Sequence, residues 1–154
     1  MRTFLLTWNP AKFDWHAFSN GVPAYPTPFM TDWTSHSTKP SKGDRFAMLR
    51  LGTKQNGIVA TGEITSDGTY TAMCYDKCLR RFVDIQVDHL FLNAYPQHLL
   101  REKFPDQCWS PQSSGISLKD KYQDDFWNTI NEFIEKKSPT PDAFTLMKML
   151  GLKQ

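Results

Sequence analysis

The sequence predicts an α+β domain with a mixed, strongly curved sheet flanked by helices. Segments with strand-like patterns are interspersed with shorter helical ones, without the regular strand–helix–strand alternation of a parallel α/β fold. One long amphipathic helix follows near the C-terminal end. The chain has 154 residues, which suits one domain with a proper core better than two. We therefore treat residues 1–154 as a single domain.

The first quarter of the chain predicts one strand and a long loop. Residues 4–8 are typical of a buried strand, which ends at Pro10 because proline lacks a backbone donor. Helical spacing of two aromatic residues predicts a short helix over 13–18. Residues 19–43 are rich in proline and have no clear period, so we expect a long loop. Long loops in compact domains are often functional.

The remainder of the chain has stronger periodic signals. Alternating apolar and polar residues make 82–92 the clearest strand. Gly62 within a predicted strand indicates a bulge or a close backbone approach. The other expected elements are a hairpin of strands 44–51 and 57–66, a helix over 96–104, a last strand over 115–118, an amphipathic helix over 120–137 and a short helix over 143–150.

Composition argues against several functional classes. No apolar run approaches the roughly 20 residues of a membrane helix, and the N-terminal apolar stretch is too short for a signal peptide. Cys74, Cys78 and Cys108 cannot all pair within the chain, which favours a reducing cytoplasm. Cys74 and Cys78 lack further ligands at metal-binding spacing, and neither a phosphate-binding loop nor a nucleophile motif is present. We therefore expect no metal, cofactor or membrane partner.

Three of the five tryptophans lie beside small polar residues rather than within apolar runs. They are Trp8, Trp33 and Trp109, whereas Trp15 and Trp127 have apolar partners at helical spacing and are interpreted as core. A ring beside hydroxyl and amide groups can stack a flat ligand while its neighbours bind the ligand edge. A nucleobase is the obvious candidate. Because a single tryptophan more often packs than binds, burial of all three is the competing interpretation.

Polar and basic residues near these rings complete the predicted site. Asp32 adjoins Trp33, so its carboxylate could accept a hydrogen bond from an exocyclic amine, although capping of a local turn is the alternative. The net charge of +2 is nearly neutral, but basic residues group around two loops, which are candidates for phosphate contacts or are simply solvated. The predicted base-binding residues are Trp8, Asn9, Asp32, Trp33, Thr34, Ser35, Trp109, Gln112, Ser113 and Ser114, and the predicted phosphate-binding residues are Lys39, Lys42, Arg80 and Arg81.

Four segments in order along the chain resemble the EVE domain, a member of the PUA-like superfamily that includes the YTH readers of methylated adenine. They are residues 3–10, 42–52, 57–63 and 109–116. The match spans most of the chain and is closest to EVE-like modules found with modification-dependent restriction nucleases. The resemblance implies a PUA-like, curved, β-barrel-like sheet flanked by helices, with an aromatic cage that holds a flipped modified base.

The resemblance also implies which residues form the cage. Trp33 stands where one cage aromatic is found, in the loop before the Gly-Asp strand, and Trp109 stands near the late loop that supplies another. Trp8 and Asn9 belong to the same mouth. Residues 32–36 replace the Trp-Asp-Gly-Val-Arg-Asn pattern of stand-alone family members.

We therefore expect a non-catalytic reader of a modified cytosine or adenine flipped out of DNA, serving a modification-dependent restriction or defence system. DNA is favoured over RNA, and a separately encoded nuclease or motor is a possible partner. Three alternatives stay open: a reader of RNA modifications, an ASCH-like amidohydrolase acting on a modified nucleoside with Glu63 or Asp32 as proton carrier, and a structural module with buried tryptophans.

Overall fold

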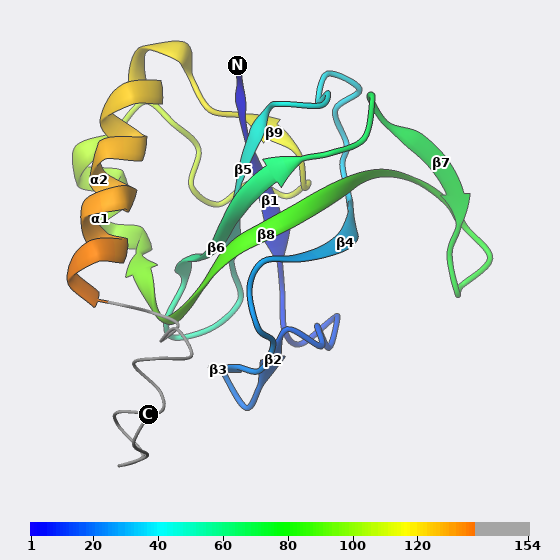
Figure 1. The fold of residues 1–154 in the computed structure, drawn as a ribbon, viewed down its shortest axis with the longest axis horizontal. Helices are drawn as coiled ribbons and strands as arrows, with labels where there is room; N and C mark the ends of the chain where they lie inside the picture. The colour runs from blue at the N-terminus through cyan, green and yellow to red at the C-terminus, as the bar shows by residue number, and fades with distance from the viewer. Residues whose placement is uncertain (138–154) are drawn as a thin grey trace, which may run out of the picture.

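A seven-stranded mixed sheet forms the centre of the computed structural model, which describes residues 1–137. The strand order is β4-β8-β6-β5-β1-β9, and β7 pairs with β8 outside this path. In Figure 1, α1 and α2 lie together at one side of the sheet and β7 lies at the other. The elements are β1 (Thr3–Trp8), β2 (Phe18–Ser19), β3 (Val22–Pro23), β4 (Phe29–Thr34), β5 (Arg45–Arg50), β6 (Gly57–Ile64), β7 (Tyr70–Met73), β8 (Leu79–Pro96), α1 (Gln97–Lys103), β9 (Ile116–Ser117), a 3-10 turn η1 (Asp120–Tyr122) and α2 (Gln123–Lys137).

The predicted α+β class is confirmed, with one correction to the expected barrel-like sheet. β1 pairs in parallel with β5 and antiparallel with β9, so the sheet is mixed. The sheet is curved but not closed, because β4 and β9 remain its edge strands. Within residues 1–137 the two edges do not pair as strands; beside the end of β4, the His36 amide donates to the Ser114 carbonyl (2.6 Å) and Ser114 Oγ donates to the Thr34 carbonyl (2.7 Å).

Most of the predicted sheet is confirmed, and the errors lie in two regions. The expected helix over 13–18 is wrong, because residues 10–17 form turns that lead into β2. The expected loop over 19–43 contains β3 and β4, and β7 was not predicted. The predicted helix over 143–150 lies outside the described residues. Among the helices of residues 1–137, none is both long and apolar enough to cross a membrane.

Both faces of the sheet are buried, and alternate residues of the strands belong to different clusters. We call these the helix-side cluster, which α1 and α2 help to form, and the loop-side cluster, which the segment after β1 covers. The helix-side cluster consists of Leu5, Ala47, Leu49, Ile58, Phe91, Tyr95, Leu100, Phe104, Trp109, Leu118, Phe126, Trp127 and Ile130. The loop-side cluster consists of Leu6, Trp8, Trp15, Ala17, Phe18, Trp33, Phe46, Met48, Val59, Ala60, Ile64, Val83, Ile85, Val87 and Leu90.

The prediction of a close backbone approach at Gly62 is confirmed. The register of β6 against β8 shifts between Thr61 and Gly62. A Cβ at Gly62 would overlap the carbonyl oxygen of Gln86, so only glycine fits here without moving β8.

Candidate functional site

A pocket of about 510 Å³ adjoins the loop-side cluster. It lies where the parallel strands β1 and β5 end, between the segment that follows β1 and the loop that joins β5 to β6. This volume falls within the range of small-molecule sites in proteins. The residues that line it are Trp8, Pro10, Phe13, Asp14, Phe18, Asn20, Gly21, Arg50, Thr53, Lys54 and Gln55.

Three aromatic side chains form one wall of this pocket. Trp8 and Phe18 are buried and stack with ring centroids 5.2 Å apart. The Phe13 ring is 53% exposed at the pocket. The Trp8 indole Nε1 donates to the Phe13 carbonyl (2.8 Å), which ties the segment to the end of β1. Such a wall suits a flat ligand, since aromatic rings favour stacked arrangements with other rings.

A fixed cation, Arg50, also lines the pocket. Arg50 is 7% exposed, and its Nε and Nη2 donate to the Gln55 carbonyl at 3.2 and 2.8 Å. Burial lowers the pKa of Arg50, but an arginine pKa starts so high that the guanidinium stays charged at neutral pH. Gln55 uses two of the five guanidinium N–H donors, so Arg50 can still donate to a ligand. Asp14 and Asn20 add acceptors to the same pocket.

The Asn9 side chain lies where the segment after β1 meets the β5–β6 loop. Its Oδ1 accepts a hydrogen bond from the Ala11 amide (3.0 Å). Gly52, at the start of the β5–β6 loop, has a φ of +74°, and a Cβ there would lie 2.7 Å from Asn9 Nδ2. The close approach therefore requires glycine at position 52. Asn9 shapes the mouth predicted from the sequence but does not line the pocket.

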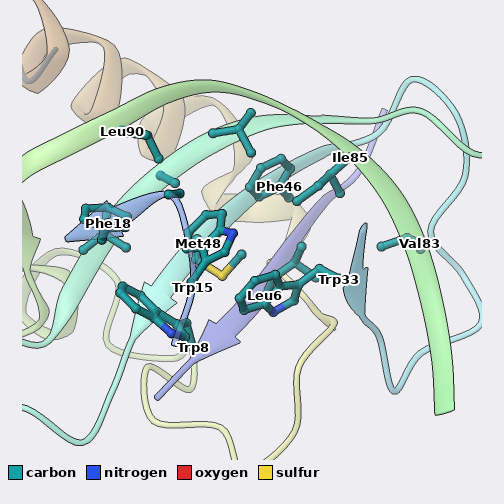
Figure 2. Packing of buried hydrophobic residues seen from close by; sticks show 14 of the residues in the cluster. Leu6, Trp8, Trp15, Phe18, Trp33, Phe46, Met48, Val83, Ile85 and Leu90 are labelled. Carbon is teal, nitrogen blue, oxygen red and sulfur yellow. The ribbon is translucent and has the colours of Figure 1, made fainter. Parts of the chain in front are cut away.

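Trp33 lies in the same cluster as Trp8 but behind the pocket rather than in its wall. It is buried, and its Nε1 donates to the Thr7 carbonyl (3.0 Å). The rings of Trp15 and Phe13 lie 4.8 and 5.4 Å from it. Figure 2 shows Trp8, Trp15 and Trp33 gathered beside Met48 on this side of the sheet. The structure thus brings Trp8 and Trp33 into one cluster, in which the Trp15 ring contacts both of them.

Trp109 belongs to the other side of the sheet, so it cannot share one cage with Trp33. It is 2% exposed, and its Nε1 donates to the Phe104 carbonyl (3.0 Å). Its ring stacks on Phe126 of α2, with centroids 5.9 Å apart. The prediction that these two tryptophans form opposing walls is corrected, because the turn around Trp109 directs its ring beneath α2. Gln112, in the following loop, is exposed.

Ser114, Thr34 and Ser35 do converge, at the junction between the two sheet edges. Ser114 Oγ accepts from the Thr7 amide (3.1 Å) and donates to the Thr34 carbonyl (2.7 Å). Ser35 Oγ donates to the Ser37 carbonyl (2.9 Å). A Cβ at Gly115 would overlap Ser35, and Gly115 has a φ of +93°. These hydroxyls hold the backbone beside Trp33; Ser113, next to them, is partly buried.

The carboxylates considered for proton transfer lie elsewhere. Asp32 is exposed on β4, opposite Asp84 of β8, and Glu63 is exposed on β6, opposite Gln86. Neither lines the pocket. Asp32 and Glu63 therefore lie apart from the aromatic wall, whereas Asp14 is the carboxylate that lines the pocket.

The predicted phosphate contacts are distributed over two regions. Lys39 and Lys42 are exposed between β4 and β5, and Lys39 lines a second cavity, of about 300 Å³, with Arg2 and Lys119 among others. Arg80 forms an ion pair with Asp76 (2.5 Å), and Arg81 Nη1 donates to the His36 carbonyl (2.6 Å). The phosphate-binding roles of these four residues stay predictions.

The sequence did not identify Phe13, Arg50 or the β5–β6 loop as parts of a site. Arg50 has a weak signal, since a charged residue follows the apolar run 46–49 at the end of this strand. Exposed residues Thr53, Lys54 and Gln55 have none, because they resemble any solvated turn.

Comparison of the fold with solved structures defines its class. No family model and no curated protein matches this sequence. The fold of residues 1–137, an open mixed sheet with α1 and α2, is nevertheless similar to that of human THYN1, solved in complex with DNA containing 5-methylcytosine. That likeness has a TM-score of 0.56 at 13% identity and covers 84% of this chain and 97% of that chain.

Two further structures share the fold. A hypothetical protein from Leishmania major has a TM-score of 0.59 at 14% identity, over 86% of this chain and 96% of that chain. A protein from Pseudomonas syringae has a TM-score of 0.53 at 14% identity, over 82% of this chain and 98% of that chain. These likenesses show a shared fold, and the family resemblance inferred from the sequence stays a prediction.

Proposed function

We propose that this protein binds a modified nucleobase of DNA, without catalysing a reaction, in the pocket beside Trp8. The observation that carries the proposal is the pocket itself, which is lined by three aromatic residues and by a guanidinium held by Gln55. The similarity in fold to THYN1, whose solved structure contains 5-methylcytosine DNA, supports a modified base as the ligand.

Each wall has a role in this proposal. Trp8, Phe13 and Phe18 stack the base, which contributes on the order of 1 to 3 kcal/mol per base. Arg50 donates to a ring nitrogen or carbonyl of the base, and Asp14 accepts from an exocyclic amine. A methyl group adds about 1 to 3 kcal/mol when the apolar wall encloses it.

In a duplex, the base must first leave the stack, at a cost of roughly a few kcal/mol. Contacts of Lys39, Lys42, Arg80 or Arg81 with the phosphate backbone offset this cost in our proposal. We further propose that the domain is the recognition module of a modification-dependent restriction or defence system, with a separate nuclease or motor. The sequence resemblance to EVE-like modules of such systems supports this role.

Binding of labelled oligonucleotides tests the proposal. Fluorescence anisotropy would compare duplexes that contain 5-methylcytosine, N6-methyladenine or only unmodified bases, and the same sequences as RNA. We expect tighter binding of one modified DNA. Equal affinity for modified and unmodified DNA would refute the proposal, and a preference for modified RNA would transfer it to RNA.

A pair of exposed aromatic residues provides matched variants. Phe13→Ala should weaken binding of the preferred oligonucleotide by about 5- to 150-fold, the equivalent of about 1 to 3 kcal/mol of stacking. Tyr25→Ala is the control, because Tyr25 is 45% exposed and does not line the pocket. Equal losses in the two variants would place the ligand elsewhere.

A further inference from the structure

Trp15 fills a chamber directly behind the pocket. Its side chain is 1% exposed, with the rings of Trp33, Trp8 and Phe18 at 4.8, 5.5 and 5.7 Å. Figure 2 shows the indole at the centre of this group, beside Met48. Because Trp8 and Phe18 also line the pocket, the chamber and the pocket share a wall. The chamber therefore holds a flat, two-ring group next to the proposed base site.

The polarity of this chamber does not match the indole. Trp8, Trp33, Trp109 and Trp127 each donate their Nε1 to an oxygen at 2.8 to 3.0 Å. Trp15 Nε1 is buried and has no hydrogen-bond partner among the described residues. Leaving a buried donor without an acceptor is unfavourable. The side chains around the indole belong to the apolar loop-side cluster, so an apolar group could fill this space without leaving a donor unpaired.

The segment that carries Trp15 is separate from the sheet. Within residues 1–137, residues 10–16 form hydrogen bonds with partners in residues 8–18. The amides of Lys12 and Phe13 donate to the Asn9 carbonyl, and the Trp15 carbonyl accepts from the Phe18 amide. The segment contains turns and no strand. Outward movement of Trp15 therefore breaks no pairing between strands.

We infer that Trp15 occupies, in the free protein, a chamber into which the base bound in the pocket extends, and that the ligand is a base with an apolar substituent such as a methyl group. The inference rests on the proposed function. The bound base lies in the pocket against Trp8, which pocket and chamber share, and its substituent enters the space that the indole leaves. The released indole N–H then gains water as its hydrogen-bond partner. An unmodified base leaves the apolar wall unfilled, which accounts for discrimination.

Nucleoside titration of Trp15→Ala tests whether the ligand displaces the Trp15 indole. We expect the folded variant to bind 5-methyl-2′-deoxycytidine about 10-fold more tightly than the native protein does. Phe133→Ala is the control for a general loss of packing, since Phe133 is a half-buried aromatic residue on the helix side. The affinity of this variant for the nucleoside should equal that of the native protein. Equal or weaker binding by folded Trp15→Ala, with native discrimination of methylated DNA intact, would overturn the inference while leaving the proposed function standing.

A measurement on the native protein covers the case in which Trp15→Ala does not fold. In an indole ¹⁵N–¹H spectrum, saturation with the preferred methylated oligonucleotide should move the Trp15 resonance to a solvent-exposed position with fast proton exchange. A Trp15 resonance that stays protected at saturation would overturn the inference. Failure of the native protein to distinguish methylated from plain DNA would instead refute the proposed function.

Discussion

The helix side and the loop side of the sheet are both rich in tryptophan, but they are covered in different ways. On the helix side, Trp109 and Trp127 donate hydrogen bonds, and the guanidinium carbon of Arg45 lies 3.4 Å from the Trp127 ring centroid beneath α2. On the loop side, the cover consists of turns, Trp15 has an unpaired N–H, and the open pocket adjoins it. The number of aromatic residues therefore does not distinguish the core from the proposed binding site. The segment that covers them does, because helices cover one side and turns cover the other.

The largest expected effect concerns Trp109. Because its ring is buried against Phe104 and Phe126, Trp109→Ala should lower the free energy of unfolding by about 3 to 5 kcal/mol. Urea denaturation followed by circular dichroism measures this loss. A stable Trp109→Ala protein that no longer distinguishes methylated DNA would restore Trp109 as a cage wall. It would contradict the assignment of the helix side to the core.

Two matched substitutions compare the sides directly. Both Trp127→Phe and Trp15→Phe shrink a buried ring, but only Trp127 has a satisfied N–H, which donates to Thr3 Oγ1 at 2.8 Å. We expect Trp127→Phe to cost about 1 kcal/mol more than Trp15→Phe, since only the first loses a hydrogen bond, while Thr3 Oγ1 still accepts from Gln123 Nε2 at 2.7 Å. Thermal or urea unfolding of the two variants checks the difference. Equal costs would show that the Trp15 N–H is satisfied in solution.

The junction of the sheet edges predicts a smaller effect. Ser114→Ala removes the acceptor of the Thr7 amide and the donor to the Thr34 carbonyl. We expect a loss of about 1 kcal/mol, the usual net worth of a hydrogen bond, in the same unfolding assay. Gln112→Ala, in the same loop but exposed, serves as the control. No loss in Ser114→Ala would mean that the junction contributes nothing to stability.

The smallest expected effect is a pH dependence of stability on the helix side. Burial lowers the pKa of His89, with Arg45 adding to the shift and Asp88 opposing it. The folded state therefore favours the neutral imidazole. His89 contributes stability that is present above its unfolded pKa of about 6.5 and is lost as the pH falls through its lower folded pKa. His89→Gln should flatten the decline in Tm between about pH 7.5 and 5; an unchanged decline would contradict this assignment.

The sequence predicted the sheet better than it predicted the site. Strand 82–92 was evident because its buried and partly exposed residues alternate, and β8 contains it. The segment after β1 was misassigned because a turn that buries Trp15 and Phe18 gives the same spacing as a helix. Local pattern cannot separate these cases, since the hydrogen bonds that define a helix are not visible in the spacing of apolar residues.

The two cage tryptophans illustrate what local composition misses. Cys108 and Ser110 are exposed on either side of Trp109, yet the ring between them turns inward. Polar neighbours thus describe where the backbone lies, not where the side chain points. Trp33 lies on β4 rather than in the expected loop, and its burial behind Phe13 depends on a segment distant in sequence. Arg50 was missed because its partner is a backbone carbonyl, which leaves no trace in residue identity.

Hydrogen–deuterium exchange with the native protein tests most directly the claim that the loop side binds the base and the helix side is core. Exchange would be followed with and without a saturating duplex that contains the preferred modified base. We predict slower exchange in the β5–β6 loop, residues 51–56, altered exchange in residues 9–21, and no change in α2. Changes confined to α2 and the Trp109 turn, with 9–21 and 51–56 unaffected, would contradict the account.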